Sequence, residues 1–330
     1  MNRNFLVFGN NRHKAPVVTA DSIMYGPAWV DYEQTVDSVK ATIPNMFFKD
    51  YIDQVKTKSI LQVYINKFKG RALPHVLIHG NAGCGKTTLA RTIAGEHHVP
   101  FVEIISKSIL EASQLVDLIK QAKGGIVFID EIHGLKRDKA EVIYSMMEDF
   151  KYNGKDIEPF TLIGATTEYG ELLRSRRPFV DRFKLNLELE PYNNKSLELL
   201  IRQYAKKHSE GVRLTSEAYR AIASNSRLVP RMAIRLLDNT VCFDGNYKQV
   251  FSNYNIVKDG YTEKDIKTLA YLSKNKTCGI DSISSYLNIP RQSFLYEVEP
   301  YLLQTGLIVR KGTGRSITSE GIMFLSSVQP

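Results

Sequence analysis

Cysteine is scarce in this 330-residue sequence. There are three, at positions 84, 242 and 278, and none lies in a CxxC or Cys/His pattern. Their odd number and wide spacing argue against a disulfide framework and against a zinc site. Long apolar runs are missing too, since no stretch approaches the roughly 18 residues of a membrane span. Charged residues and Asn interrupt the short apolar stretch near the start, so no signal peptide is expected. We therefore expect a cytoplasmic protein without a membrane partner.

Acidic residues are outnumbered, and unevenly so. The chain carries 44 Lys and Arg against 35 Asp and Glu, a formal net charge of +9. Residues 1–190 are nearly balanced, with 25 basic and 23 acidic side chains, whereas residues 191–330 carry 19 and 12. This basic excess favours a polyanion as the partner of the C-terminal part, although solubility alone would also account for a modest excess.

The hydrophobic pattern divides the chain into parts. Residues 1–46 show no sustained period and are interpreted as an N-terminal extension. Residues 47–190 alternate short apolar strands with helices, which predicts an α/β domain with a parallel sheet covered on both faces. Residues 191–245 predict a small all-α unit, and residues 260–330 predict helices followed by a short basic hairpin, as in a winged helix. The polar stretch 244–260 is interpreted as a linker. Four buried strands are expected: His75–His79, Phe101–Ile105, Ile126–Ile129 and Phe160–Ala165.

A glycine-rich loop follows the first of these strands. It reads GNAGCGKT and fits the pattern GxxxxGK[ST] between a predicted strand and a predicted helix, the context that a phosphate-binding loop requires. Its backbone N–H groups and the helix N-terminus can hold phosphate oxygens. Lys86 would reach the β- and γ-phosphates of ATP, and the Thr87 hydroxyl would ligate Mg²⁺. The alternative is a chance glycine-rich turn. The residues expected to contact the nucleotide are Gly80, Asn81, Ala82, Gly83, Cys84, Gly85, Lys86, Thr87 and Thr88.

Two carboxylates follow the third expected strand, at Asp130 and Glu131. In a parallel sheet, the end of that strand faces the same crevice as the glycine-rich loop. Asp130 can hold the Mg²⁺ shell, and Glu131 can polarise the attacking water. Two acids in succession favour hydrolysis over a nucleotide-dependent switch. The alternative is a strand that merely ends in solvated carboxylates.

Further motifs follow in a fixed order along the chain. They are DEIH at 130–133, GATT at 164–167, DRF at 181–183, PRMAIRLL at 230–237 and EPYLLQTG at 299–306. Together they resemble RuvB, a family of AAA+ motors that drive branch migration of Holliday junctions, over roughly residues 47–319. The resemblance implies an AAA+ P-loop ATPase domain, a helical lid and a C-terminal winged-helix domain. It also implies branched or duplex DNA as a partner and a ring of identical subunits, expected to be a hexamer.

The resemblance assigns roles to single residues. Thr167, or its neighbour Thr166, is similar to sensor 1, a hydroxyl able to touch the γ-phosphate or the water. Arg182 resembles an arginine finger donated to the ATP of a neighbouring subunit, because a planar guanidinium can neutralise several phosphate oxygens. Arg231 resembles sensor 2, carried by the lid onto the nucleotide. The plainer interpretations are a local ion pair for Arg182 and a helix-surface residue for Arg231.

Two other sites follow from the resemblance. Tyr51 and Ile52 lie where the family has a segment beside the adenine. Arg310, Lys311 and Arg315 lie on the expected wing, where the family touches DNA. Phosphate contact needs only cations at a reachable tip, so no sequence preference is implied. The alternative for the wing is a solvated charged turn.

The chain also departs from the family. Only Phe150–Glu158 fills the place of a long hairpin that the partner RuvA grips, and Asn153-Gly154 predicts a tight turn within it. Val180 replaces a basic residue of the family, and residues 1–46 have no counterpart. We therefore expect weak or absent dependence on a RuvA-like partner.

Two other functions remain open at this point. One is a clamp-loader-like AAA+ remodeller, and the other is an origin-initiator-like DNA-binding switch with slow hydrolysis. Directional movement along DNA without a sliding clamp would separate the three.

Overall fold

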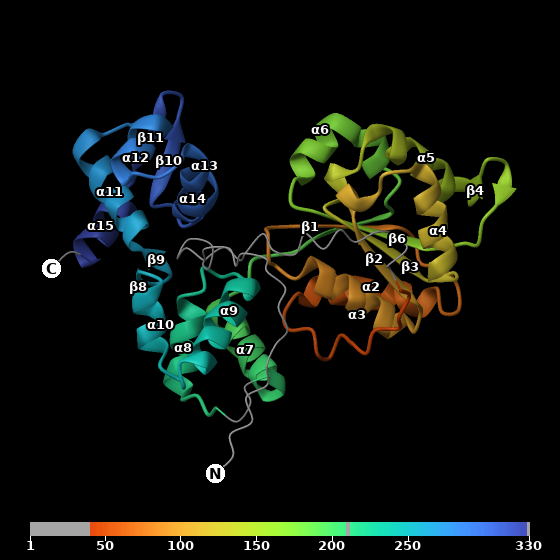
Figure 1. Ribbon diagram of the computed structural model, residues 1–330, viewed down its shortest axis with the longest axis horizontal. Helices are drawn as coiled ribbons and strands as arrows, with labels where there is room; N and C mark the ends of the chain where they lie inside the picture. The colour runs from red at the N-terminus through yellow and green to blue at the C-terminus, as the bar shows by residue number, and fades with distance from the viewer. Residues whose placement is uncertain (1–39, 209–211, 329–330) are drawn as a thin grey trace, which may run out of the picture. The chain divides into compact units, whose positions relative to one another are not determined.

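The α/β domain is built on a five-stranded parallel sheet. The computed structural model describes residues 40–208 and 212–328 of the chain (Figure 1). The strand order is β2-β3-β6-β1-β7, and every pairing in this sheet is parallel. The strands are β1 (Val76–His79), β2 (Phe101–Ile105), β3 (Ile126–Asp130), β6 (Thr161–Thr166) and β7 (Leu185–Glu188). The ends of β1, β3 and β6 therefore share one edge, and the expected α/β class is confirmed.

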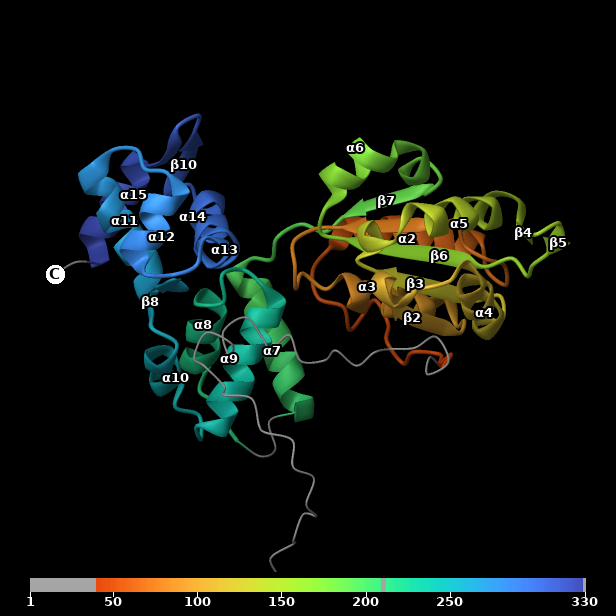
Figure 2. The same cartoon turned by 45° about the horizontal axis from the view of Figure 1, so that its top comes forward.

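Helices cover both faces of this sheet (Figures 1 and 2). On one face lie α2 (Val55–Lys67) and α3 (Lys86–His97). On the other lie α4 (Ala112–Ala122), α5 (Arg137–Asp149) and α6 (Tyr169–Val180). Successive strand residues serve alternate faces: Val76 and Ile78 pack toward α2 and α3, whereas Leu77 packs toward α4 and α5. Burial on both faces explains why these strands read as continuous apolar runs.

Short elements complete the domain. Two 3₁₀ turns, Ser106–Ser108 and Ile132–Gly134, follow β2 and β3. The segment after α5 forms a hairpin of two-residue strands, β4 (Lys151–Tyr152) and β5 (Lys155–Asp156). Asn153 and Gly154 turn between them with φ of 49° and 73°. The tight turn predicted from Asn153-Gly154 is confirmed, and the hairpin is short.

The helical lid is larger than predicted. It contains α7 (Asn194–His208), α8 (Ser216–Ser224), α9 (Pro230–Cys242) and α10 (Tyr247–Asn253) around a shared core. The interpretation of residues 244–260 as a linker is wrong. Helix α10 lies there and packs against α9, and its Val250 is fully buried in the lid core.

The last part of the described chain is a winged helix, as predicted. A short hairpin, β8 (Ile256–Lys258) and β9 (Tyr261–Thr262), leads into α11 (Glu263–Asn275) and α12 (Ile280–Leu287). The next helix is continuous through α13 (Arg291–Ser293), the π-helical η4 (Phe294–Val298) and α14 (Glu299–Gln304). The wing is β10 (Ile308–Lys311) and β11 (Gly314–Ile317), followed by α15 (Ser319–Val328). Within residues 40–208 and 212–328, no helix is both long and apolar enough to cross a bilayer.

Candidate nucleotide-binding site

The loop between β1 and α3 has the backbone of a phosphate-binding loop. Gly83 and Gly85 have φ of 74° and 98°, which side-chain-bearing residues rarely adopt. Lys86 begins α3 and is buried, and its Nζ donates to the carbonyl oxygens of Gly80 (3.0 Å) and Asn81 (3.2 Å). Neutral carbonyls hold the ammonium inside the loop without compensating its charge. The loop therefore suits an anionic ligand.

Two oxygen ligands meet beside Lys86. Thr87 Oγ1 donates to Asp130 Oδ2 over 3.4 Å, across the gap between α3 and β3. Burial raises the pKa of Asp130, although the hydrogen bond from the Glu131 amide opposes the shift. A divalent cation would favour the charged carboxylate, and a hydroxyl plus a carboxylate are ligands that Mg²⁺ accepts together with phosphate oxygens. Thr87 and Asp130 thus fit the metal predicted for them.

Glu131 is held by a threonine from the neighbouring strand end. Its φ of 48° places it in the left-handed region, so it turns out of β3. Thr167 Oγ1 donates to Glu131 Oε2 at 3.0 Å. Thr166 is fully buried instead, with its Oγ1 3.0 Å from His133 Nδ1, and His133 Nδ1 lies 3.3 Å from Glu131 Oε2. Of the two candidate threonines, Thr167 is the one that contacts the acid.

A cavity of about 240 Å³ adjoins the loop. Tyr51 Oη donates to the Gly85 carbonyl, and Tyr192 Oη donates to the Ile52 carbonyl, both over 3.3 Å. Burial raises the pKa of Tyr192 to about 12, so its hydroxyl stays protonated. Thr88 also lines the cavity, as do Leu200, Pro230 and Ile234 of the lid. Tyr192 was not predicted as a site residue from the sequence, because the adjacent Pro191 indicated only a domain boundary there.

The lid touches the phosphate-binding loop through α9. The amide of Arg231 donates to the Gly83 carbonyl over 3.4 Å. A Cβ on Gly83 would lie 2.9 Å from Arg231 Cβ and 3.0 Å from Val229 Cγ1, so only glycine fits at that position. The structure therefore places the backbone of Arg231 against the loop, and its role as sensor 2 stays a prediction.

Arg182 has different surroundings. Its Nε lies 3.0 Å from Glu148 Oε1, its guanidinium lies 4.8 Å from the ring centre of Tyr144, and it donates to the Pro178 carbonyl. All three partners lie on α5 and α6, and none belongs to the loop of its own chain. These contacts agree with action on a neighbouring subunit and equally with a local ion pair.

The wing cations differ from one another. Arg310 and Arg315 both pair with Glu299, a side chain with no exposed surface. Burial alone would raise the pKa of Glu299, but hydrogen bonds from the two arginines lower it on balance. The Arg315 side chain is 13% exposed and that of Arg310 is 60% exposed, while Lys311 is exposed. Arg310 and Lys311 can thus reach a polyanion, and Arg315 chiefly fixes the wing to α14.

Comparisons with known proteins match this architecture. The family model described as the Holliday junction DNA helicase RuvB P-loop domain matches residues 43–189, and the RuvB C-terminal winged helix domain matches residues 258–326. The RuvB subunit of the Holliday junction branch migration complex from Mycoplasma genitalium is 33% identical over 303 residues, covering 86% of this chain and 97% of that protein. The chain belongs to the RuvB family. The same subunit from Ehrlichia ruminantium is 34% identical over 309 residues, covering 86% of this chain and 92% of that protein.

Solved structures of RuvB agree with this assignment. A RuvB structure from Thermotoga maritima, named a Holliday junction branch migration motor, superposes with a TM-score of 0.70 at 32% identity. The match covers 87% of this chain and 99% of that one. The resemblance inferred from the motifs is therefore confirmed along nearly the whole length of the relatives.

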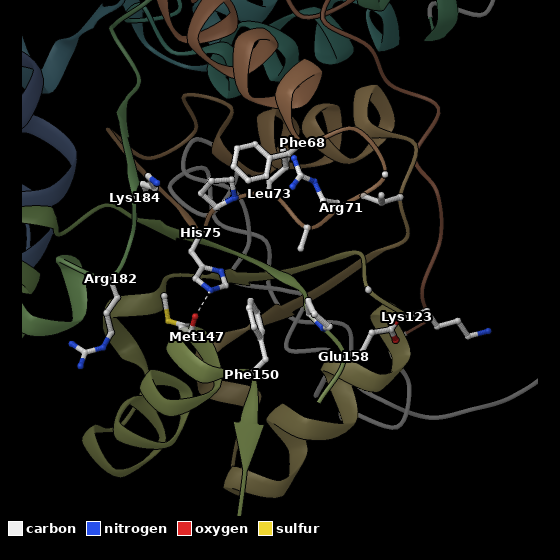
Figure 3. Close-up of a pocket in the computed structure, with 16 residues that line it drawn as sticks. Phe68, Arg71, Leu73, His75, Lys123, Met147, Phe150, Glu158, Arg182 and Lys184 are labelled. Atoms are coloured by element: carbon white, nitrogen blue, oxygen red, sulfur yellow. Dashed lines mark hydrogen bonds between the residues drawn. The ribbon is translucent and has the colours of Figure 1, made fainter. Parts of the chain in front are cut away.

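This RuvB-family chain also has a larger cavity, of about 840 Å³, shown in Figure 3. His75 lies in its wall, with Nε2 3.1 Å from the Met147 carbonyl and Nδ1 accepting from the Leu162 amide. Phe150, at the start of the short hairpin, lies beside it (Figure 3). His75 directly precedes β1, so this cavity lies at the amino ends of the strands. The nucleotide loop lies at their carboxyl ends, and the two sites are distinct.

Proposed function

We propose that this chain hydrolyses ATP in a ring of identical subunits, a hexamer, and uses the free energy to move Holliday junctions or other branched DNA. The observation that carries the proposal is the contact between Thr167 and Glu131 beside a complete phosphate-binding loop. A carboxylate held in this way at the metal-ligand edge suits a general base, whereas a nucleotide-dependent switch needs none. The winged helix in the same chain supplies the DNA-binding part.

Binding of ATP follows from the loop and the cavity beside it. Lys86 neutralises the β- and γ-phosphates, and backbone N–H groups of Gly80–Gly85 bind their oxygens. The adenine enters the cavity lined by Tyr51 and Ile52. Arg231 contacts the bound nucleotide from the lid, because the first turn of its helix, α9, packs against Gly83.

Hydrolysis uses groups on either side of the γ-phosphate. Glu131 accepts a proton from the attacking water, and the hydrogen bond from Thr167 fixes the orientation of its carboxylate. Arg182 of one subunit stabilises the charge on the nucleotide of the next. Mg²⁺, held by Thr87 and Asp130, would neutralise phosphate charge when bound.

The test is movement of a synthetic four-way junction by the purified chain with ATP, without and with a bacterial RuvA. We expect ATP-dependent junction movement that does not require RuvA, because the hairpin β4–β5 offers little surface to grip. ATP hydrolysis without any movement would contradict the motor and favour a DNA-binding switch. Dependence on a sliding clamp would favour a clamp-loader-like remodeller. Strict dependence on RuvA would contradict the expected independence from that partner.

Changing Arg310 and Lys311 to Ala should weaken binding to duplex DNA in a salt-dependent way. Each phosphate neutralised contributes about 0.9 to the slope of log affinity against log salt, so the slope should fall by up to about 1.8 per engaged subunit. Fluorescence anisotropy over a salt series measures it, with similar losses expected on unrelated sequences. Lys274→Ala, at an exposed lysine of α11, is the control for the loss of a single lysine outside the wing. An unchanged slope would mean that the wing is a solvated turn.

A further inference from the structure

Arg227 joins the lid to the winged-helix domain. It follows α8, its side chain is 9% exposed, and its Nη2 donates to Asp265 Oδ2 at 2.6 Å. Its Nε donates to the Gly260 carbonyl at 2.8 Å, and its Nη1 to the Glu297 carbonyl at 3.0 Å. The guanidinium also lies 4.9 Å from the ring centre of Tyr301. One side chain of the lid thus binds the β8–β9 turn, α11, η4 and α14.

The winged-helix side of this contact is also buried. Asp265 has no exposed surface, and its Oδ2 also accepts from the amide and the hydroxyl of Thr262, at 2.6 and 2.7 Å. The Gly260 amide donates to Asn225 Oδ1 of the lid at 2.9 Å. A Cβ on Gly260 would lie 3.0 Å from Arg227 Cγ. A buried ion pair tolerates the loss of water only while such hydrogen bonds persist, so sliding at this contact is costly.

The same short segment reaches the nucleotide loop. Arg227 and Leu228 both have left-handed backbones, with φ of 52° and 59°. Side chains adopt such backbones only where the surroundings hold them, so this turn is not a slack connection. Val229 and Arg231 come next and rest against Gly83. Residues 227–231 therefore contact the winged helix at one end and the nucleotide loop at the other.

We propose that Arg227 is a positioning residue that couples the nucleotide loop to the DNA-binding domain. The lid and the winged helix turn as one body when the contact at Gly83 changes with the bound nucleotide. The inference rests on the proposed motor activity. Arg227 touches neither Lys86 nor Glu131, so loss of its contact leaves basal hydrolysis in place. Loss of this contact would let the winged helix move independently of the lid.

The test replaces Arg227 by Met together with Asp265 by Leu, because a buried pair exchanged for apolar residues is often tolerated. Basal ATP hydrolysis should stay near the wild-type rate. Junction movement should fall by about 10-fold or more, within the 5–150-fold range of coupling between sites. The matched control is Arg202→Met with Glu198→Leu. This lid pair also places an arginine over a tyrosine, Tyr219, at 4.4 Å, and its contacts lie within the lid. The control should move junctions normally.

A distance measurement tests the contact between the lid and the winged helix without relying on the motor activity. Spin labels on the exposed Cys242 of the lid and on Met323→Cys of α15 report the lid-to-winged-helix distance; Cys84 and Cys278 are buried. We expect one narrow distribution, unchanged between ADP and a non-hydrolysable ATP analogue, that broadens in the Arg227→Met, Asp265→Leu protein. A distance that changes with nucleotide in the wild type would overturn the proposal. So would full junction movement by the double variant. If the wild-type protein hydrolyses ATP but moves no junction, the proposed motor activity is wrong. The spin-label distances would still show whether the lid and the winged helix move together.

Discussion

Changing Arg182 to Ala is expected to lower ATP turnover by about 10³-fold or more, the effect typical of arginine fingers. The loss should fall on turnover rather than on nucleotide affinity, because Arg182 contacts Glu148 and Tyr144 and not its own loop. Steady-state hydrolysis and calorimetric titration with a non-hydrolysable ATP analogue measure the two separately.

A mixing experiment shows whether Arg182 acts between subunits. Lys86→Ala protein has a defective loop and an intact finger, so mixed rings with Arg182→Ala protein should regain part of the activity. Glu148→Ala is the control for the local ion pair, and it should leave turnover largely intact. Absence of rescue in rings shown to be mixed would count against action between subunits. An equal loss in Glu148→Ala would instead favour the local ion pair.

Changing Glu131 to Gln should strongly lower turnover and preserve ATP binding. Removal of a general base costs about 10²–10⁴-fold. The amide keeps the shape of the side chain and can still meet Thr167, so the loop and the metal ligands should be undisturbed. Lys86→Ala should behave in the opposite way and lose binding, because the charge that faces the phosphates is gone. Binding and single-turnover hydrolysis of labelled ATP distinguish the two patterns.

A neighbouring carboxylate provides the matched control. Glu168 directly follows Thr167, but its carboxylate lies 3.7 Å from His133 Nε2, whereas the Thr167 hydroxyl donates to Glu131. Glu168→Gln should therefore hydrolyse ATP near the wild-type rate. Wild-type turnover by Glu131→Gln would show that another group activates the water.

The sheet and its nucleotide loop could be predicted because their signals are local. Buried parallel strands are apolar on both faces, and the loop motif needs its glycines in consecutive sequence. Strand β7 lacks this continuous apolar signal and was not predicted. It lies at the edge of the sheet, where Asn186 and Glu188 stay exposed, so the run is too polar to stand out. Helix α10 was missed because it places a single fully buried residue, Val250, in the lid core.

Pairings between distant charges could not be predicted. The wing arginines were expected to contact DNA or to be solvated, yet Arg310 and Arg315 share Glu299, which belongs to the motif that helped to suggest the family. Arg227 and Asp265 lie in what looked like separate domains, on either side of an expected linker. Side-chain type and spacing show which groups can pair. Only the packed structure shows which of them do.

The position of β1 in the sheet has a consequence for how the protein folds. Both neighbours of β1 come late in the chain, since β6 begins at Thr161 and β7 at Leu185. Ribosomes deliver about 5–20 residues per second, so β1 waits several seconds for its partners with both edges unpaired. Such distant pairings close slowly, because the intervening chain must first be ordered. The lid and the winged helix, built from neighbouring helices, can form while the sheet is still closing.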